Sequence, residues 1–289
     1  MNPALGPTLE AMVATRDSGR DLAADPLVVV RRYASAADRE AAAWVAALLA
    51  YGRVASILRA LDDLLGRMPD GPGAFLAELD VPRDSRRLRG FKHRWTRGAD
   101  LIEALAATRA EIDAHGSMEA AFLAGDDARS PHLGPALADF SARLLARVPE
   151  ARRTRSVRWL LAGVGGGSAA KRLCLFLRWV ARPDDGLDLG LWKGVDPARL
   201  VVPLDTHVFR IGHHLGLTDR RTPGWQAALD ITAALSRLDP KDPVRFDFAL
   251  SHLGILGDCP SSPVPETCGP CPIRSVCRHW AGQPGRLVG

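Results

Sequence analysis

Apolar residues recur at helical spacing along most of the chain. Between Arg39 and Leu65 they fall at i, i+3 and i+4, and Gly52 interrupts the run. This spacing predicts helices that pack through one apolar face. Similar patterns predict helices at residues 99–114, 134–148, 168–180, 206–215, 224–237 and 243–256. Clusters of Pro, Gly and Asp mark connections at residues 69–73, 125–135, 183–186 and 257–270.

No stretch of the sequence alternates between apolar and polar residues for long enough to predict a strand. The short apolar run Leu27 to Val30 follows Asp25-Pro26, which is typical of a helix start. We therefore expect an all-α fold. It would consist of a two-lobed helical domain over residues 1–257, a cysteine-rich loop over 258–280 and a tail over 281–289.

Composition places the chain among soluble globular proteins. It has 289 residues, of which 47% are hydrophobic and 25% charged. The longest apolar run, Ala41 to Tyr51, has 11 residues and is too short to cross a bilayer. The N-terminus has no pattern of a secretory signal. We therefore expect a cytoplasmic monomer with no membrane partner. The net charge of +5 is a mild bias toward polyanions.

Four of the five cysteines gather near the C-terminus with the spacing C-x8-C-x2-C-x5-C. They are Cys259, Cys268, Cys271 and Cys277. Structural zinc usually takes two short cysteine pairs, whereas a four-cysteine iron–sulfur cluster suits one C-x2-C with flanking single cysteines. The spacing favours a [4Fe-4S] cluster, with zinc as the alternative. Cys174 lies on an apolar helix face and is interpreted as a core residue.

A glycine turn and an aspartate motif lie upstream of the cysteines. Gly163 and Gly165 lie in a turn between two helical patterns, where backbone N–H groups can bind phosphate. The segment Pro203 to Arg210 reads P-L-D-T-H-V-F-R, and Asp205 or Thr206 can cap the helix that follows. Each feature alone is common in helical proteins. Basic residues precede the turn, namely Arg152, Arg153, Arg155 and Arg158.

Together these motifs resemble the endonuclease III branch of the helix-hairpin-helix DNA glycosylases. In that family the hairpin reads roughly L-P-G-V-G-x-K-T-A, the aspartate motif V-D-T-H-V-x-R and the cluster C-x6-C-x2-C-x5-C. The resemblance covers roughly residues 157–280, with the hairpin at about 157–180 and the aspartate motif at 203–210. The first gap between cysteines is two residues longer here. The chain also resembles a bacterial group of endonuclease-III-like proteins without an assigned function.

The resemblance implies a DNA repair glycosylase with AP-lyase activity, in which Asp205 and a lysine are catalytic. In a literal register the family's lysine falls on Gly167, which would leave a non-catalytic nucleic-acid-binding protein. In a second register the turn carries an insertion and Lys171 opens the next helix, as in the archaeal 8-oxoguanine glycosylases. Lys171 is one of four lysines among 38 basic residues and lies 34 residues before Asp205. We favour the second register. A zinc-stabilised interaction module is a third possibility, and it would make the aspartate motif a coincidence.

The chemistry of base excision explains both catalytic assignments. A carboxylate stabilises the positive charge that develops on the sugar, and a neutral amine attacking C1′ forms a Schiff base. Arg172 would lower the pKa of Lys171 if it pointed the same way. The extruded base leaves a hole that a wedge must fill, and Tyr51 and Arg53 are the candidates because Leu48 to Arg53 is similar to the family's L-L-S-x-Q-x.

The DNA-binding residues implied by this comparison are Gly163, Gly165, Tyr51, Arg53, Arg155 and Arg158. A further basic segment, Arg83 to Arg97, carries seven basic residues and one acidic residue, with Phe91 and Trp95 between them. It is either a strip that contacts phosphates and stacks on bases, or a solvated helix face whose aromatic residues point into the core. The sequence does not specify the target base.

Overall fold

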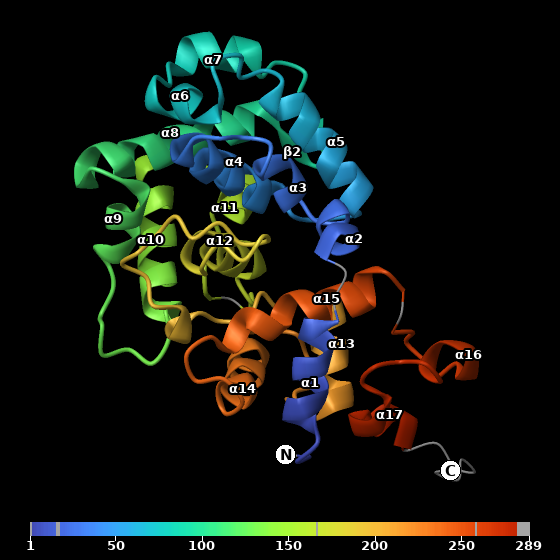
Figure 1. Ribbon diagram of the computed structural model, residues 1–289. Coiled ribbons are helices and arrows are strands. Elements are labelled where there is room, and N and C mark those ends of the chain that lie inside the picture. Colours follow the sequence, from blue (N-terminus) through green and yellow to red (C-terminus); the bar gives the residue numbers. More distant parts are fainter. Residues whose placement is uncertain (1, 16–17, 166, 258, 282–289) are drawn as a thin grey trace.

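The computed structural model describes residues 2–15, 18–165, 167–257 and 259–281 (Figure 1). These residues are mostly helical, which confirms the all-α prediction. The first elements are α1 (Leu5–Ala14), α2 (Ser18–Ala23), α3 (Leu27–Val30), α4 (Ala36–Leu49), α5 (Val54–Leu65), α6 (Pro72–Ala77), α7 (Val81–Arg87), β1 (Lys92–His93) and β2 (Thr96–Arg97). The middle elements are α8 (Gly98–His115), α9 (Met118–Leu123), α10 (Gly134–Arg147), the 3-10 turn η1 (Glu150–Arg152), α11 (Arg155–Leu160) and α12 (Lys171–Ala181). The last are η2 (Pro197–Arg199), α13 (Thr206–Leu215), α14 (Trp225–Ser236), η3 (Pro243–Phe246), α15 (Asp247–Ile255), α16 (Pro265–Cys268), η4 (Arg274–Val276) and α17 (Arg278–Ala281).

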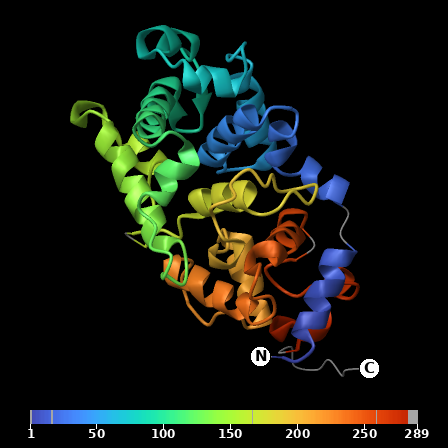
Figure 2. The ribbon, with the colours of Figure 1, turned by 60° about the vertical axis from the view of Figure 1, so that its left-hand side comes forward.

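The helices form two groups, which we call the first lobe and the second lobe (Figures 1 and 2). The first lobe comprises α3 to α12 and is built around α4, which packs against α3, α6 and α12. The second lobe comprises α13 to α17 together with the N-terminal helix α1, which lies beside α13 and α15. The first and last described helices, α1 and α17, therefore lie in the same lobe. Between the lobes, α12 faces the start of α13, so residues at those two helix ends can meet.

The apolar pattern of α4 explains its central position. Every residue from Ala41 to Ala50 is buried, because the helix is covered on all sides. Trp44 is fully buried, and its ring packs edge-on against Phe140 of α10 and Phe176 of α12. Ser35 caps the N-terminus of the helix, since its side chain accepts a hydrogen bond from the Asp38 N–H. The helix ends before Gly52, whose φ of 98° turns the chain into α5.

Some boundaries differ from the sequence predictions for identifiable reasons. The predicted helix at 168–180 starts only at Lys171, because Ala170 has a left-handed conformation with φ of 49°. The predicted helix at 243–256 begins as the 3-10 turn η3 and continues as α15. The short helices α6, α7 and α9 were not predicted, because six or seven residues give too little periodicity. The ten-residue helix α1 was not predicted either. Cys174 is buried in the core, as predicted.

The basic segment Arg83 to Arg97 is not one helix face. It consists of α7 followed by a hairpin in which Lys92 pairs with Arg97 and His93 with Thr96. The two aromatic residues separate: Phe91 is buried in the core, whereas Trp95 at the hairpin turn is 49% exposed. In the described part of the chain, no helix combines the length and the apolar character needed to cross a bilayer.

Candidate active site

Asp205 lies at the N-terminus of α13, where it acts as the predicted N-cap. Its Oδ1 atom accepts hydrogen bonds from the backbone N–H groups of His207 and Val208, both at 2.8 Å. The capping interaction occupies one carboxylate oxygen. The other, Oδ2, faces Lys171. The side chain is 16% exposed, so Asp205 can both cap a helix and meet a ligand.

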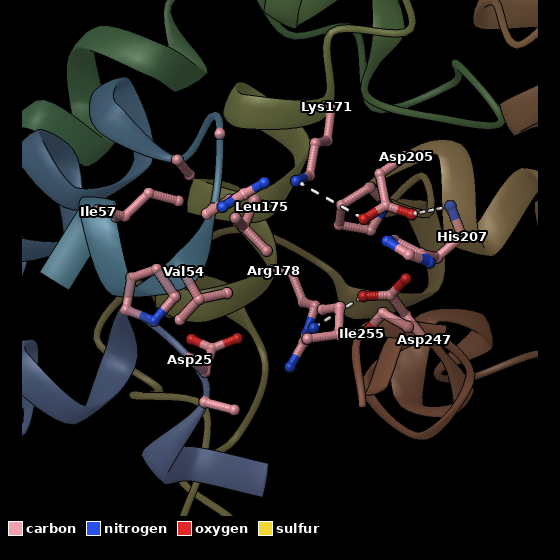
Figure 3. A pocket seen from close by; sticks show the side chains of 17 residues that line it. Asp25, Val54, Ile57, Lys171, Leu175, Arg178, Asp205, His207, Asp247 and Ile255 are labelled. Carbon is pink, nitrogen blue, oxygen red and sulfur yellow. Dashed lines mark hydrogen bonds and ion pairs between the residues drawn. The ribbon is translucent and has the colours of Figure 1, made fainter. Parts of the chain in front are cut away.

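Lys171 is the first residue of α12 and lies opposite Asp205. Its Nζ atom is 3.7 Å from Asp205 Oδ2, and its side chain is 35% exposed (Figure 3). The structure thus brings together two predicted catalytic residues that are 34 positions apart in the sequence. Gly167, the other candidate for the family's lysine position, is exposed in the turn before α12 and does not line the pocket at Asp205.

Lys171 and Asp205 open onto a pocket of about 400 Å³ between the lobes (Figure 3). Its walls come from segments far apart in the sequence: the α4–α5 connection supplies Arg53, the start of α3 supplies Asp25, and α12 supplies Arg178. Asp247 and Ser251 of α15 complete the opposite side. The volume lies within the range of small-molecule sites, roughly 300–1,000 Å³.

The inner part of the pocket holds charges that are removed from water. Asp247 is 2% exposed, and Arg178 donates a hydrogen bond of 2.7 Å to its Oδ2 atom. The Asp247 Oδ1 atom is buried and has no hydrogen-bond partner within the described residues. Burial raises the pKa of Asp247 to about 6, helped by the nearby Asp205 and opposed by Arg178. Burial also raises the pKa of Asp25.

Sequence reasoning did not find Asp25, Arg178 or Asp247 as pocket residues. In the sequence, Asp25 indicates only a helix start before Pro26. The one available signal for Asp247 was a charge within the otherwise apolar run Phe246 to Leu250. A charged residue in such a run is buried and paired in most folds, so the pattern alone does not indicate a ligand site.

The two wedge candidates lie in different surroundings. Arg53 is exposed, lines the pocket and directly precedes α5. Tyr51 does not line the pocket: its ring contacts Trp95 and Trp159 at centroid distances of 4.8 and 4.4 Å. Its hydroxyl is 2.6 Å from the Thr96 hydroxyl oxygen. Tyr51 is therefore anchored within the first lobe, while Arg53 faces the pocket.

Arg172, the neighbour of Lys171, points away from the pair. Its Nη1 atom donates to the Leu48 carbonyl at 3.1 Å, and its guanidinium lies 3.6 Å from the centroid of the Trp159 ring. Burial lowers the pKa of Arg172 to about 10. The condition for its influence on Lys171, that both side chains point the same way, is not met.

The two hairpin glycines have different surroundings. A Cβ atom on Gly163 would lie 2.6 Å from the Ser141 Cβ atom of α10, so Gly163 permits close packing of the turn. Gly165 is exposed, with φ of 143° and nothing within 4 Å of a built Cβ, so it is open to solvent. It pairs with Ser168 in an isolated β-bridge.

The arginines before the turn differ in their partners. Arg152 is ion-paired with Glu103 at 2.8 Å, and Arg153 donates to backbone carbonyls. Arg155 and Arg158 are exposed on α11, and neither has a carboxylate within 4.0 Å among the described residues. These last two are the cations available to an anionic ligand.

The chain matches a known protein family. The family model described as "Protein of unknown function (DUF2400)" matches residues 25–256. The chain belongs to the DUF2400 family. The matched region runs from Asp25 to the end of α15 and includes every pocket residue except Ala24. No curated protein and no solved structure matches the chain.

The cysteine segment lies just beyond the DUF2400 match. Its four cysteines line one small hollow of about 20 Å³, together with His214 of α13 and residues of α17. None of the four forms a disulfide. Among the described residues, no three His, Cys, Asp or Glu side chains are close enough together to hold a metal ion. The four thiols supply the donor chemistry of a four-cysteine site.

The cysteine segment also contacts the helix that begins at Asp205. Arg210 of α13 donates a hydrogen bond of 2.6 Å to the Cys259 carbonyl. One helix therefore carries the candidate catalytic carboxylate at its start and holds the cysteine segment further along.

Proposed function

We propose that this DUF2400 protein is a DNA repair glycosylase with AP-lyase activity, which excises a damaged or modified base through Lys171 and Asp205. The observation that supports this most is the 3.7 Å separation of Lys171 Nζ and Asp205 Oδ2 beside a pocket of about 400 Å³. An amine and a carboxylate at this separation are the two groups that the reaction requires.

In the proposed reaction the target nucleotide leaves the base stack and its base enters the pocket. As the C1′–N bond lengthens, the Asp205 carboxylate stabilises the positive charge on the sugar. The Lys171 amine bonds to C1′, the departing base keeps the electron pair of the broken bond and takes up a proton, and sugar-ring opening gives a Schiff base. Elimination of the 3′ phosphate from this intermediate would cleave the strand.

Asp205 also suits the proton transfer that precedes attack. Lys171 must be neutral to act as a nucleophile, and Asp205 Oδ2, 3.7 Å away, would accept its proton after a small approach. Transfer of that proton to the departing base would then restore the carboxylate charge that stabilises the sugar. Because Asp205 Oδ1 already accepts two backbone hydrogen bonds, the carboxylate is held in a fixed orientation. That orientation directs Oδ2 toward the amine.

We further propose that the protein has the helix-hairpin-helix glycosylase scaffold and binds a [4Fe-4S] cluster through Cys259, Cys268, Cys271 and Cys277. When bound, the cluster would have a structural role and take no part in redox chemistry. The common hollow of the four cysteines supports this ligand set. The hydrogen bond from Arg210 to the Cys259 carbonyl would connect the segment to the Asp205 helix.

Borohydride trapping on abasic DNA and on a panel of damaged duplexes tests the proposal. Wild-type protein should form a covalent adduct, and Lys171→Gln should abolish it. Lys193→Gln is the matched control, because Lys193 is exposed and does not line the pocket. Base release without trapping would indicate a monofunctional glycosylase in which Asp205 directs a water molecule. DNA binding without excision or trapping on any substrate would favour the non-catalytic alternative.

A further inference from the structure

Trp95 is a large apolar side chain held at the protein surface. It occupies the turn of the β1–β2 hairpin and is 49% exposed. Its neighbour in the turn, Arg94, has a φ of 53°, a backbone conformation that is uncommon outside glycine. The turn therefore presents an indole ring to solvent at some conformational cost.

The exposed indole is fixed in position by its neighbours. It stacks on Tyr51 with a centroid distance of 4.8 Å and an interplanar angle of 27°, and meets Trp159 edge-on at 5.0 Å. Tyr51 is in turn held by the hairpin, because His93 Nε2 lies 3.0 Å from the Tyr51 carbonyl oxygen. Such an aromatic platform can bind a flat ring with little further ordering.

A hollow of about 580 Å³ adjoins this platform. It is lined by Trp95, Trp159, Arg155 and Ser156. The Ser156 hydroxyl is buried and has no hydrogen-bond partner among the residues that the structure describes. Buried hydroxyl groups are nearly always paired in native proteins, so a polar ligand atom that reached this one would satisfy it.

One arginine lines the hollow and a second lies beside the Trp95 ring, and both are without a carboxylate partner in the described part of the chain. Arg155 lines the hollow, and Arg94 lies 5.1 Å from the centroid of the Trp95 ring. Neither arginine has a carboxylate within 4.0 Å in the described ranges. The hollow thus combines aromatic surface with cations that can bind a phosphate, which is the combination that single-stranded nucleic acid requires.

The loop that lines the catalytic pocket also supports the Trp95 ring beside the hollow. Ala50, Gly52 and Arg53 line the pocket, whereas Tyr51 between them supports Trp95. On the other side, Lys171 faces the pocket while Arg172 lies over Trp159. A nucleotide on Trp95 would therefore be a close neighbour of the one in the pocket.

We infer that Trp95 and the adjoining hollow form a second binding site, for an unpaired nucleobase that stacks on the indole while its phosphate contacts Arg155. The ligand class rests on the proposed function, because that function makes DNA the partner. The site itself rests on different residues from Lys171 and Asp205. It would accept a base that loses its partner when the target nucleotide enters the pocket.

Binding to two undamaged duplexes tests the inference: one fully paired, and one with a single unpaired 2-aminopurine. Wild-type protein should prefer the second duplex and quench its fluorescence. Trp95→Ala should weaken that complex by about 5- to 150-fold, as expected for loss of one stacked base, and restore the fluorescence. Trp95→Phe should keep most of the affinity and the quenching. Ser156→Ala should lower the affinity for the duplex with the unpaired base by about 2- to 10-fold. Trp225→Ala is the control, since Trp225 lies on α14 against His132.

An unchanged affinity of Trp95→Ala for the unpaired duplex would overturn the inference. Equal losses on both duplexes would also overturn it, because Trp95 would then serve general DNA binding. If Trp95→Ala lowers the thermal midpoint of unfolding, its weaker binding could come from lost stability, and the Trp95→Phe variant then tests the inference. Absence of quenching by Trp95→Phe would count against stacking. Neither duplex requires excision, so failure of trapping at Lys171 would leave this result unaffected.

Discussion

At the scale of single residues, the two oxygens of Asp205 have separate tasks. Oδ1 caps α13 through two backbone N–H groups, and Oδ2 faces the Lys171 amine at 3.7 Å. Asparagine caps helices about as well as aspartate, whereas alanine does not cap. Replacing Asp205 with asparagine keeps the cap and removes the charge, whereas alanine removes both. The two variants therefore separate the structural role of this side chain from its proposed chemical role.

We predict that Asp205→Asn loses base excision while retaining the free energy of unfolding to within about 0.5 kcal/mol. Asp205→Ala should lose excision and also about 0.5–2 kcal/mol of stability, because the helix start loses its cap. Urea unfolding and an excision assay on the same samples measure both effects. Wild-type excision by Asp205→Asn would refute a role for the carboxylate charge.

We expect Asp247 to make the stability of the protein depend on pH. Its pKa in the folded protein is raised to about 6 from the ordinary 3.8, so the folded state holds this proton to higher pH than the unfolded chain does. The stabilisation is complete below about pH 4 and is lost as pH rises through 6. The loss amounts to as much as about 3 kcal/mol at 1.36 kcal/mol per pKa unit.

We predict that Asp247→Asn gains stability relative to wild type as the pH is raised from 4 to 7. In the wild-type protein, pairing with Arg178 offsets only part of the cost of burying the Asp247 charge. Asparagine cannot ionise and therefore avoids that cost. Urea unfolding at each pH provides the comparison. Asp219→Asn, at a side chain that is 92% exposed, should run parallel to wild type. A parallel curve for Asp247→Asn as well would show that its carboxyl group titrates normally.

At the scale of elements, the α11–turn–α12 unit depends on how closely its turn approaches α10. Gly163 would place a Cβ atom 2.6 Å from the Cβ of Ser141, and the Ser141 hydroxyl donates a hydrogen bond to the Leu161 carbonyl. Lys171 begins the helix after this turn. The packing at Gly163 therefore contributes to the position of the amine.

We expect Gly163→Ala to lower the free energy of unfolding by about 1–3 kcal/mol, because the added methyl group has no space without a backbone shift. Gly6→Ala is the control: its nearest neighbour would be Leu238 at 3.5 Å, an ordinary contact. Thermal unfolding of the two variants measures the difference. Equal melting temperatures would mean that the turn is free to move away from α10.

At the scale of the whole molecule, exposed arginines differ in whether they form an ion pair with a carboxylate. Arg155 and Arg158 of α11 have no carboxylate within 4.0 Å among the described residues, whereas Arg129 in the α9–α10 connection is paired with Asp127 at 3.1 Å. Unpaired cations attract phosphate without first breaking an ion pair. We therefore expect α11 to contribute more to DNA affinity.

Binding to undamaged duplex DNA should weaken steeply with salt, each neutralised phosphate adding about 0.9 to the slope of log affinity against log salt concentration. Replacing Arg155 and Arg158 with Gln should reduce that slope by about 2, equally on all sequences. Arg129→Gln should leave it unchanged. Fluorescence anisotropy titrations between 50 and 300 mM salt, as an approximate range, measure the slopes. A slope insensitive to the double replacement would assign the phosphate contacts elsewhere.

The cysteine segment yields a prediction on metal content. Protein purified without oxygen should be brown and contain iron and sulfide, and Cys271→Ser should lose both. Cys174→Ser is the matched control, since Cys174 is buried in the core, away from the other cysteines. Colourless protein with one equivalent of zinc would favour the alternative metal.

Local patterns in the sequence were sufficient for most of the long helices, although α1 was missed, and the motifs that resemble the glycosylases pointed to Lys171 and Asp205 as a pair. Those features depend on periodicity and on motifs of a few residues. The interior of the pocket was not predictable in this way, because Asp25, Arg178 and Asp247 meet only through packing of α3, α12 and α15. Tyr51 illustrates the same limit: its motif suggested a wedge, but the hairpin that holds it lies about 40 residues away in the sequence.

The position of α1 has a consequence for the order in which the protein is made. Glu10 of α1 pairs with Arg245, and Gly6 lies against Leu238, so the first helix is completed by residues synthesised near the end. The first lobe, in contrast, is a continuous stretch from α3 to α12. On the ribosome we expect that lobe to fold first, carrying Lys171 without its partner. Asp205 and α1 join only after α15 emerges, so a nascent chain would hold no assembled catalytic pair until its synthesis is nearly finished.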